Sequence, residues 1–205
     1  MNYIGTQSGI FNSIYIGFGQ NGRYGTNFNL AVGTNNLLSN TTGSGNTVFG
    51  INSLGANTTG GNNISIGPSS LVNNSTGGNN IGMGIQSLYF NTTGNRNVGI
   101  GIQTLTNNST GNDNVSVGFQ SLYNITTSNN TSIGSFAGAY IKGATISNAT
   151  SSNSIYIGFQ TYPLSSGDTN EIVIGYQAVG NGSNTTVIGN SKESNKKLTA
   201  ISAKP

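Results

Sequence analysis

The hydrophobic residues of this chain recur in a short motif and never form long apolar segments. The motif carries Ile or Val three residues and one residue before a glycine, with a small residue between them, as in residues 64–67 (Ile-Ser-Ile-Gly). Such alternation with a period of two is typical of a β-strand that buries one face. The sequence therefore predicts a short strand at each copy of the motif, with the Ile and Val side chains in the core.

A leucine four residues after the glycine adds a third apolar position to the copies from Gly33 to Gly118. The leucine stands an even number of residues from the glycine, whereas the strand positions stand an odd number from it, so one straight strand could not point all of them to the same face. The chain is therefore expected to bend just after the glycine, which tolerates backbone angles that other residues resist. The predicted core side chains are Ile64, Ile66, Ile81, Met83, Val98, Ile100, Val115, Val117, Leu71, Leu88, Leu105 and Leu122.

The glycines that close the motif define an internal repeat. Five successive intervals of 17 residues separate the glycines from Gly33 to Gly118. Less regular copies extend the pattern from Gly5 and Gly17 at one end to Gly189 at the other. The main structural anchors are Gly33, Gly50, Gly67, Gly84, Gly101, Gly118, Gly134, Gly158 and Gly175.

The remainder of each copy is polar. Segments such as residues 57–60 (Asn-Thr-Thr-Gly) consist of turn-forming residues, of which Asn and Gly accept left-handed conformations. Another asparagine stands four residues before the anchor glycine in the copies from Gly50 to Gly134. In stacked coils identical side chains lie above one another, so these asparagines are expected to form a hydrogen-bonded ladder. The predicted ladder consists of Asn46, Asn63, Asn80, Asn97 and Asn114.

A repeat of 17 residues is too short for a helical hairpin and has no 3.6-residue period. We therefore expect an all-β protein, a parallel β-solenoid (β-roll) of about 11–12 coils spaced about 4.8 Å apart. Each coil offers only about four apolar side chains, a thin core against the entropy of ordering the backbone. Sharing the apolar face among copies would help, so we expect a homotrimer, with a lone solenoid as the alternative.

The repeat also divides the chain. We expect solenoid coils over residues 1–137, with regular repeats at 30–134, an insertion loop at 138–153, final coils at 154–190 and a basic C-terminal tail at 191–205. All of the net charge of +3 falls in that tail, which has no interleaved arginine or aromatic residues. A solvated terminus explains it better than a nucleic-acid site.

Composition argues against several function classes. Only 33% of the residues are hydrophobic and 5% charged, and the chain contains no cysteine and no histidine. Thiolate metal ligands, disulfides and the usual general base are therefore absent. The acidic residues Asp113, Asp168, Glu171 and Glu193 are scattered along the sequence. We expect no enzymatic activity, no metal and no cofactor, and no apolar segment is long enough for membrane insertion.

Three further patterns have simple explanations. Residues 17–22 match a dinucleotide-binding fingerprint, but no helix and no acidic residue follow as that site requires. Glycosylation sequons, for example at Asn57, Asn74 and Asn91, are expected by chance where Asn, Ser and Thr are abundant. Stacked threonines in the turns would form a hydroxyl array, and a soluble β-solenoid that binds ice or glycans is therefore an alternative reading.

The Asn-x-Ile/Val-x-Ile-Gly strand, the Ser-Leu or Thr-Leu that follows, and the Asn-Thr-Thr-Gly turn resemble the head repeats of trimeric autotransporter adhesins and the related repeats of phage and large-virus tail fibres. Residues 94–105 are especially similar to the viral form. The resemblance implies a trimeric left-handed parallel β-roll that serves surface attachment. The heptad stalk and membrane anchor of an autotransporter are not seen, which favours a virion fibre.

The expected function is that of a structural and adhesive segment of a virion tail fibre or surface spike. Its partners would be further copies of itself, other fibre modules and a glycan or protein receptor on the host surface. It would lie on the virion surface or outside the cell. The head of a bacterial surface adhesin is the second possibility within the same class, and the ice- or glycan-binding solenoid belongs to a different one.

Overall fold

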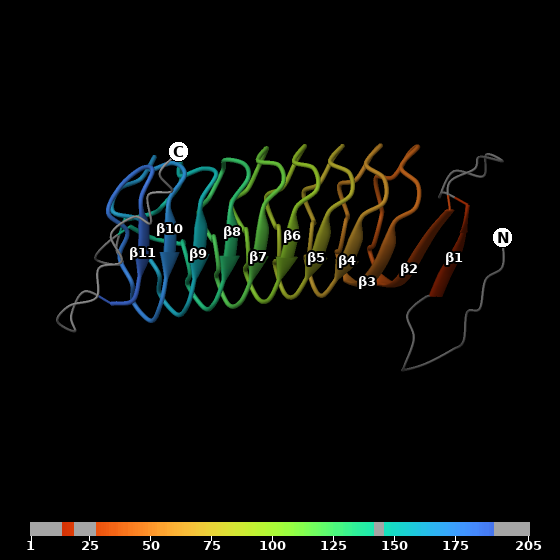
Figure 1. Ribbon diagram of the computed structural model, residues 1–205. Helices are drawn as coiled ribbons and strands as arrows, with labels where there is room; N and C mark the ends of the chain where they lie inside the picture. The colour runs from red at the N-terminus through yellow and green to blue at the C-terminus, as the bar shows by residue number, and fades with distance from the viewer. Residues whose placement is uncertain (1–13, 19–27, 142–145, 191–205) are drawn as a thin grey trace, which may run out of the picture.

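The computed structural model describes residues 14–18, 28–141 and 146–190, and most of them form a rod of stacked coils (Figure 1). The described part is all-β, and its eleven strands lie side by side in chain order in one sheet along the rod. The strands are β1 (Ile14–Phe18), β2 (Phe28–Thr34), β3 (Thr47–Ile51), β4 (Ile64–Ile66), β5 (Ile81–Met83), β6 (Val98–Ile100), β7 (Val115–Val117), β8 (Thr131–Ile133), β9 (Ile155–Ile157), β10 (Ile172–Ile174) and β11 (Thr186–Ile188).

The ten strands from β2 to β11 are parallel and in register, with equivalent residues of successive repeats paired, as in Ile64 with Ile81. They form a β-solenoid of about nine turns, which confirms the fold class but not the expected 11–12 coils. The copy at Gly17 belongs to β1, which pairs antiparallel with β2. Only nine residues separate β1 from β2, fewer than the dozen or so that a parallel return needs. The copy at Gly5 lies outside the described residues.

Each coil turns through residues with a left-handed backbone. The anchor Gly84 has φ 137°, Gln86 has φ 55° and Leu88 has φ 53°. Leucine rarely adopts positive φ, yet the same conformation recurs at the equivalent leucines. These residues are Leu37, Leu54, Leu71, Leu88, Leu105 and Leu122. The bend expected after the glycine is therefore real, and it turns the leucine side chain into the coil.

The core is built around a column of these leucines, and it also contains Val48, Ile125, Tyr156 and Val173. Five of the leucines are 0% exposed: Leu54, Leu71, Leu88, Leu105 and Leu122. The predicted strand positions lie on the opposite, outer face of the sheet, so that part of the predicted core is wrong. Those outward side chains are Ile64, Ile66, Ile81, Met83, Val98, Ile100, Val115 and Val117.

The size of the coil explains the inverted face. The residue between the two apolar strand positions points inward, and at β4 to β7 it is small: Ser65, Gly82, Gly99 or Ser116. A Cβ atom added to Gly82 would lie 2.5 Å from Ser70 Oγ and 3.2 Å from Leu71 Cγ. The leucine column already fills the interior at these strands, so only a small side chain fits between it and the sheet.

The insertion lies between β8 and β9, where the spacing of paired residues rises to 24, as in Thr131 with Ile155. An antiparallel bridge joins Tyr140 to Ser147 across residues 142–145, which lie outside the described ranges. Parallel pairing then resumes in the expected final coils. The expected basic tail at 191–205 also falls outside the described residues.

Candidate functional site: ladders inside the rod and an apolar face outside it

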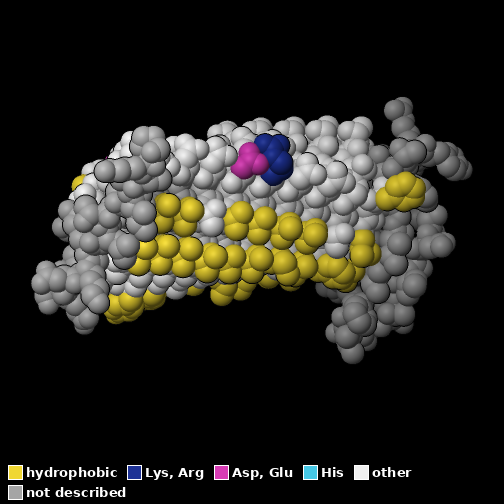
Figure 2. Space-filling model, in the orientation of Figure 1, with side chains coloured by type: hydrophobic (Ala, Val, Ile, Leu, Met, Phe, Trp, Pro, Cys, Tyr) yellow, Lys and Arg dark blue, Asp and Glu magenta, His cyan; other side chains and the backbone are white. Residues whose placement is uncertain are grey.

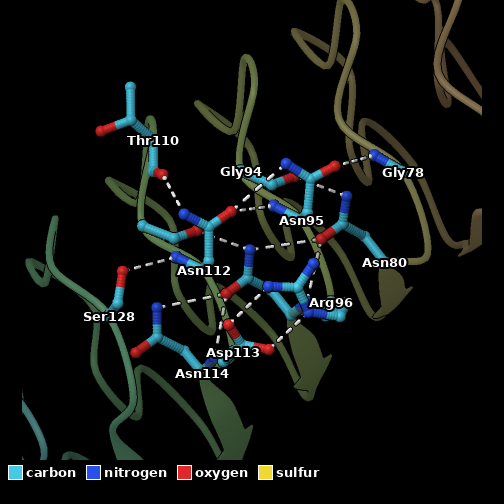
Figure 3. Close-up of polar contacts among 12 residues, drawn as sticks. Gly78, Asn80, Gly94, Asn95, Arg96, Thr110, Asn112, Asp113, Asn114 and Ser128 are labelled. Atoms are coloured by element: carbon cyan, nitrogen blue, oxygen red, sulfur yellow. Dashed lines mark hydrogen bonds and ion pairs between the residues drawn. The ribbon is translucent and has the colours of Figure 1, made fainter.

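The predicted asparagine ladder runs through the buried interior of the rod. The rung formed by Asn80 illustrates it: its Nδ2 donates to Asn63 Oδ1 at 3.1 Å and to the carbonyl of Gly94 at 2.8 Å. Its Oδ1 accepts the backbone N–H of Asn97 at 2.9 Å. Figure 3 shows this chain of bonds between Asn80 and Asn114. Equivalent bonds link Asn29, Asn46, Asn63, Asn80, Asn97, Asn114 and Asn130.

A second asparagine ladder begins each Asn-Thr-Thr-Gly segment, where sequence reasoning expected only a turn. Asn74 Nδ2 donates to Asn57 Oδ1 at 3.0 Å and to the carbonyl of Gly77 at 2.9 Å. The ladder ends where Ile125 occupies the position, which leaves Asn108 Oδ1 buried without a hydrogen-bond partner. Its members are Asn40, Asn57, Asn74, Asn91 and Asn108. The 17-residue spacing was the signal that could have revealed it.

The burial of the second ladder shows that the asparagines of its glycosylation sequons have a structural role. Asn57, Asn74 and Asn91 are 0% exposed, and their amide nitrogens are bound inside the rod. A glycan attached to any of these nitrogens would have to occupy the interior of a coil. In the folded chain these sequons are therefore structural residues and cannot carry sugar.

The threonines of the turns form two columns with different roles. In the first column the hydroxyl donates to a backbone carbonyl of the next coil, as Thr58 Oγ1 does to Ser75 at 2.9 Å. The second column, which includes Thr59, Thr76 and Thr93, is exposed. Of the expected hydroxyl array, only the second column has side chains that do not bond to a neighbouring coil. This column lies on a turn and not on the sheet.

The outer face of the sheet carries rows of apolar side chains along the rod, seen as yellow bands in Figure 2. We call this surface the apolar face. Its twelve most exposed large side chains, each 36–64% exposed, are Phe49, Ile51, Ile64, Met83, Ile85, Ile100, Ile102, Phe119, Ile133, Phe159, Tyr176 and Ile188. A contiguous apolar surface of this extent marks an interaction site in most proteins.

One ion pair crosses the polar side of the rod. Arg96 Nε and Nη2 donate to Asp113 Oδ1 and Oδ2 at 2.6 and 2.8 Å (Figure 3). The hydrogen bond lowers the pKa of Asp113 and raises the pKa of Arg96. Asn129 and Asn153 form the equivalent rung at 3.0 Å elsewhere in the same column. The exposed pair therefore takes the place of a polar rung and contributes little to stability.

The aromatic residues near the insertion pack against one another along the apolar face. The ring centroids of Phe119 and Phe136 lie 5.1 Å apart, and Phe159 stacks on Tyr176 at 5.6 Å. Inside the coil, burial raises the pKa of Tyr156 to about 12. Ring packing between neighbouring coils therefore explains the placement of Phe119, Phe136, Phe159 and Tyr176.

The acidic residues do not converge. Asp113 pairs with Arg96, Asp168 lies at the surface of the final coils and Glu171 is buried there, whereas Glu193 lies outside the described residues. Within residues 14–18, 28–141 and 146–190, no three His, Cys, Asp or Glu side chains are placed to hold a metal ion. The same ranges contain no helix of the length and apolarity needed to cross a membrane. That the chain is not an enzyme stays a prediction.

Comparison of the chain with protein-family models, curated proteins and solved structures found no match.

Proposed function

We propose that this chain is a structural segment of an extended fibre in which the apolar face packs against further copies of the chain. The observation that carries the proposal is the continuity of that face along β3 to β11. Monomeric soluble proteins rarely leave such a surface in water. A second copy is the natural occupant, because a rod with a regular repeat along its length matches an identical rod placed beside it.

Burial energies indicate that the whole face is needed for association. Each of the twelve side chains retains about half of its surface, so completing its burial contributes about 1 kcal/mol. Together they supply on the order of 10 kcal/mol, against an association cost of about 4–15 kcal/mol. A patch of two or three coils would not suffice. Three chains around a common axis would cover one face of each chain, and the resemblance to trimeric repeats favours three copies over two.

Association is tested by measuring the mass in solution with light scattering or sedimentation. The proposal expects three times the chain mass of 21.0 kDa. The triple variant Ile85→Thr, Ile100→Thr and Ile102→Thr keeps β-branched side chains but removes apolar area, and it should be monomeric with an unchanged circular-dichroism spectrum.

A control with the same number of changes comes from the exposed threonine column: Thr59→Ala, Thr76→Ala and Thr93→Ala should remain trimeric. A monomeric parent protein, or a triple isoleucine variant that still trimerises, would contradict the proposal.

The rod form and the repeat resemblance support a virion tail fibre or surface spike as the setting, with a host-surface glycan or protein as receptor. An antibody against the chain should label intact particles in electron micrographs at fibres or spikes. Labelling of bacterial surfaces instead would favour the adhesin head, and labelling of neither would refute both settings.

A further inference from the structure

Glu171 stands in the final coils at the position where earlier coils carry a ladder asparagine. It precedes the anchor Gly175 by four residues, as Asn80 precedes Gly84. Its side chain is 0% exposed. Its backbone N–H donates to Ser154 Oγ at 3.1 Å, so Ser154 and Glu171 continue the stack beyond the asparagines. An ionisable group therefore replaces a neutral amide at a buried rung.

The carboxyl group of Glu171 lies against the backbone of the last coil. Oε1 accepts the N–H of Gly182 at 3.0 Å, whereas Oε2 is buried with no hydrogen-bond partner. Gly180 lies so close to the carboxyl group that a Cβ atom there would overlap Oε1. The acid is therefore enclosed by the coil that closes this end of the rod.

None of the charged and titratable groups that the described ranges place around Glu171 stabilises its ionised form. Asp168 repels it, and the Tyr156 hydroxyl faces the same interior. The described ranges contain one basic side chain, Arg96, and that residue pairs with Asp113. Burial, opposed by the N–H of Gly182, raises the pKa of Glu171 to about 7. The surroundings of Glu171 therefore favour its protonated, neutral form.

We propose that Glu171 is an acid-operated lock on the last coil of the rod: as the neutral acid it lets residues 175–189 pack onto the stack, and as the carboxylate it loosens them. Opening the coil returns the acid to water, where its pKa is 4.5. Between pH 4.5 and about 7, opening therefore releases a proton and becomes easier as the pH rises. Packing of the last coil is tightest below pH 4.5, and the gain is lost as the pH reaches about 7.

Amide hydrogen exchange, corrected for the intrinsic rate at each pH, tests the lock. The reporter is the N–H of Gly180, which donates to the carbonyl of Tyr162 at 2.8 Å. Its protection should fall about tenfold per pH unit between pH 4.5 and 7 and then level off. In Glu171→Gln, an isosteric mimic of the neutral acid, it should stay constant. The N–H of Gly84, bonded to Ile66 at 2.7 Å, serves as the internal control and should not respond in either protein.

Asp168→Asn provides a second, independent variant. Because the charge of Asp168 raises the pKa of Glu171, removing it should keep the pH response of Gly180 but move its end point to lower pH. Constant protection of Gly180 in the parent protein, or the same slope in Glu171→Gln, would refute the lock. Should Glu171→Gln not fold, an unshifted response in Asp168→Asn refutes it equally. The last coil carries Tyr176 and Ile188 of the apolar face, so association adds protection at Gly180 at every pH, whereas the slope with pH reports the ionisation of Glu171.

Discussion

The interior ladder makes a quantitative prediction at Asn80. The side chain bridges three coils, because it donates to Asn63 and Gly94 and accepts from Asn97. Asn80→Ala removes these bonds and leaves the N–H of Asn97 and the carbonyl of Gly94 with fewer partners in a site that is 0% exposed. The ladder bond to Asn63 also disappears.

The magnitude follows from the one group left unpaired, the N–H of Asn97, since the carbonyl of Gly94 keeps the bond from Asn91 Nδ2. A buried polar group without a partner costs about 1–3 kcal/mol. The cavity left by the amide adds to this loss, because the neighbouring coils are held at their spacing by the sheet. We expect Asn80→Ala to lower the free energy of unfolding by about 2–4 kcal/mol.

Urea unfolding followed by circular dichroism measures the loss. Thr76→Ala is the matched control, since Thr76 is exposed on a turn of the same coil and its loss should change stability by less than about 0.5 kcal/mol. If Asn80→Ala falls within about 1 kcal/mol of this control, the ladder does not hold the coils together and the reasoning fails.

Two further changes test the packing inside the coils. Gly99→Val should destabilise the chain by about 3 kcal/mol, because its Cβ would lie 2.6 Å from Ser87 Oγ. Ile100→Val on the outer face should lose about 1 kcal/mol or less. Equal losses in thermal unfolding would show that the faces are assigned the wrong way round. Gly138→Ala should lower the unfolding temperature by several degrees, because Gly138 has φ 64° and its Cβ would lie 2.7 Å from Tyr156 Cδ2. An unchanged temperature would mean that the ring can move aside.

The sequence predicts those features of the fold that follow directly from the 17-residue period. Equal residues one repeat apart stack in register, so the Leu71 column and the Asn63 ladder follow from spacing alone. Period-two alternation is different, because it says that Ile64 and Ser65 face opposite ways but not which of them faces inward. That choice depends on the space left beside Leu71, which only the folded coil reveals. The second ladder was missed for a related reason: Asn57 sits in a turn motif, and turns are normally at the surface.

The inverted arrangement explains why this rod is suited to assembly. Hydrogen-bonded ladders fill the interior together with one leucine per coil up to Leu122 and with Tyr156 and Val173 in the final coils, so the isoleucines of the sheet are not required to build the core of a single chain. In a conventional solenoid a polar substitution on the sheet would weaken both the fold and any interface. Here the two are separable, since Asn80 contributes to the fold and Ile100 is half-buried at the surface. Substitutions at Asn80 should therefore lower the stability of each coil, whereas polar substitutions at Ile100 should act mainly on the association of chains.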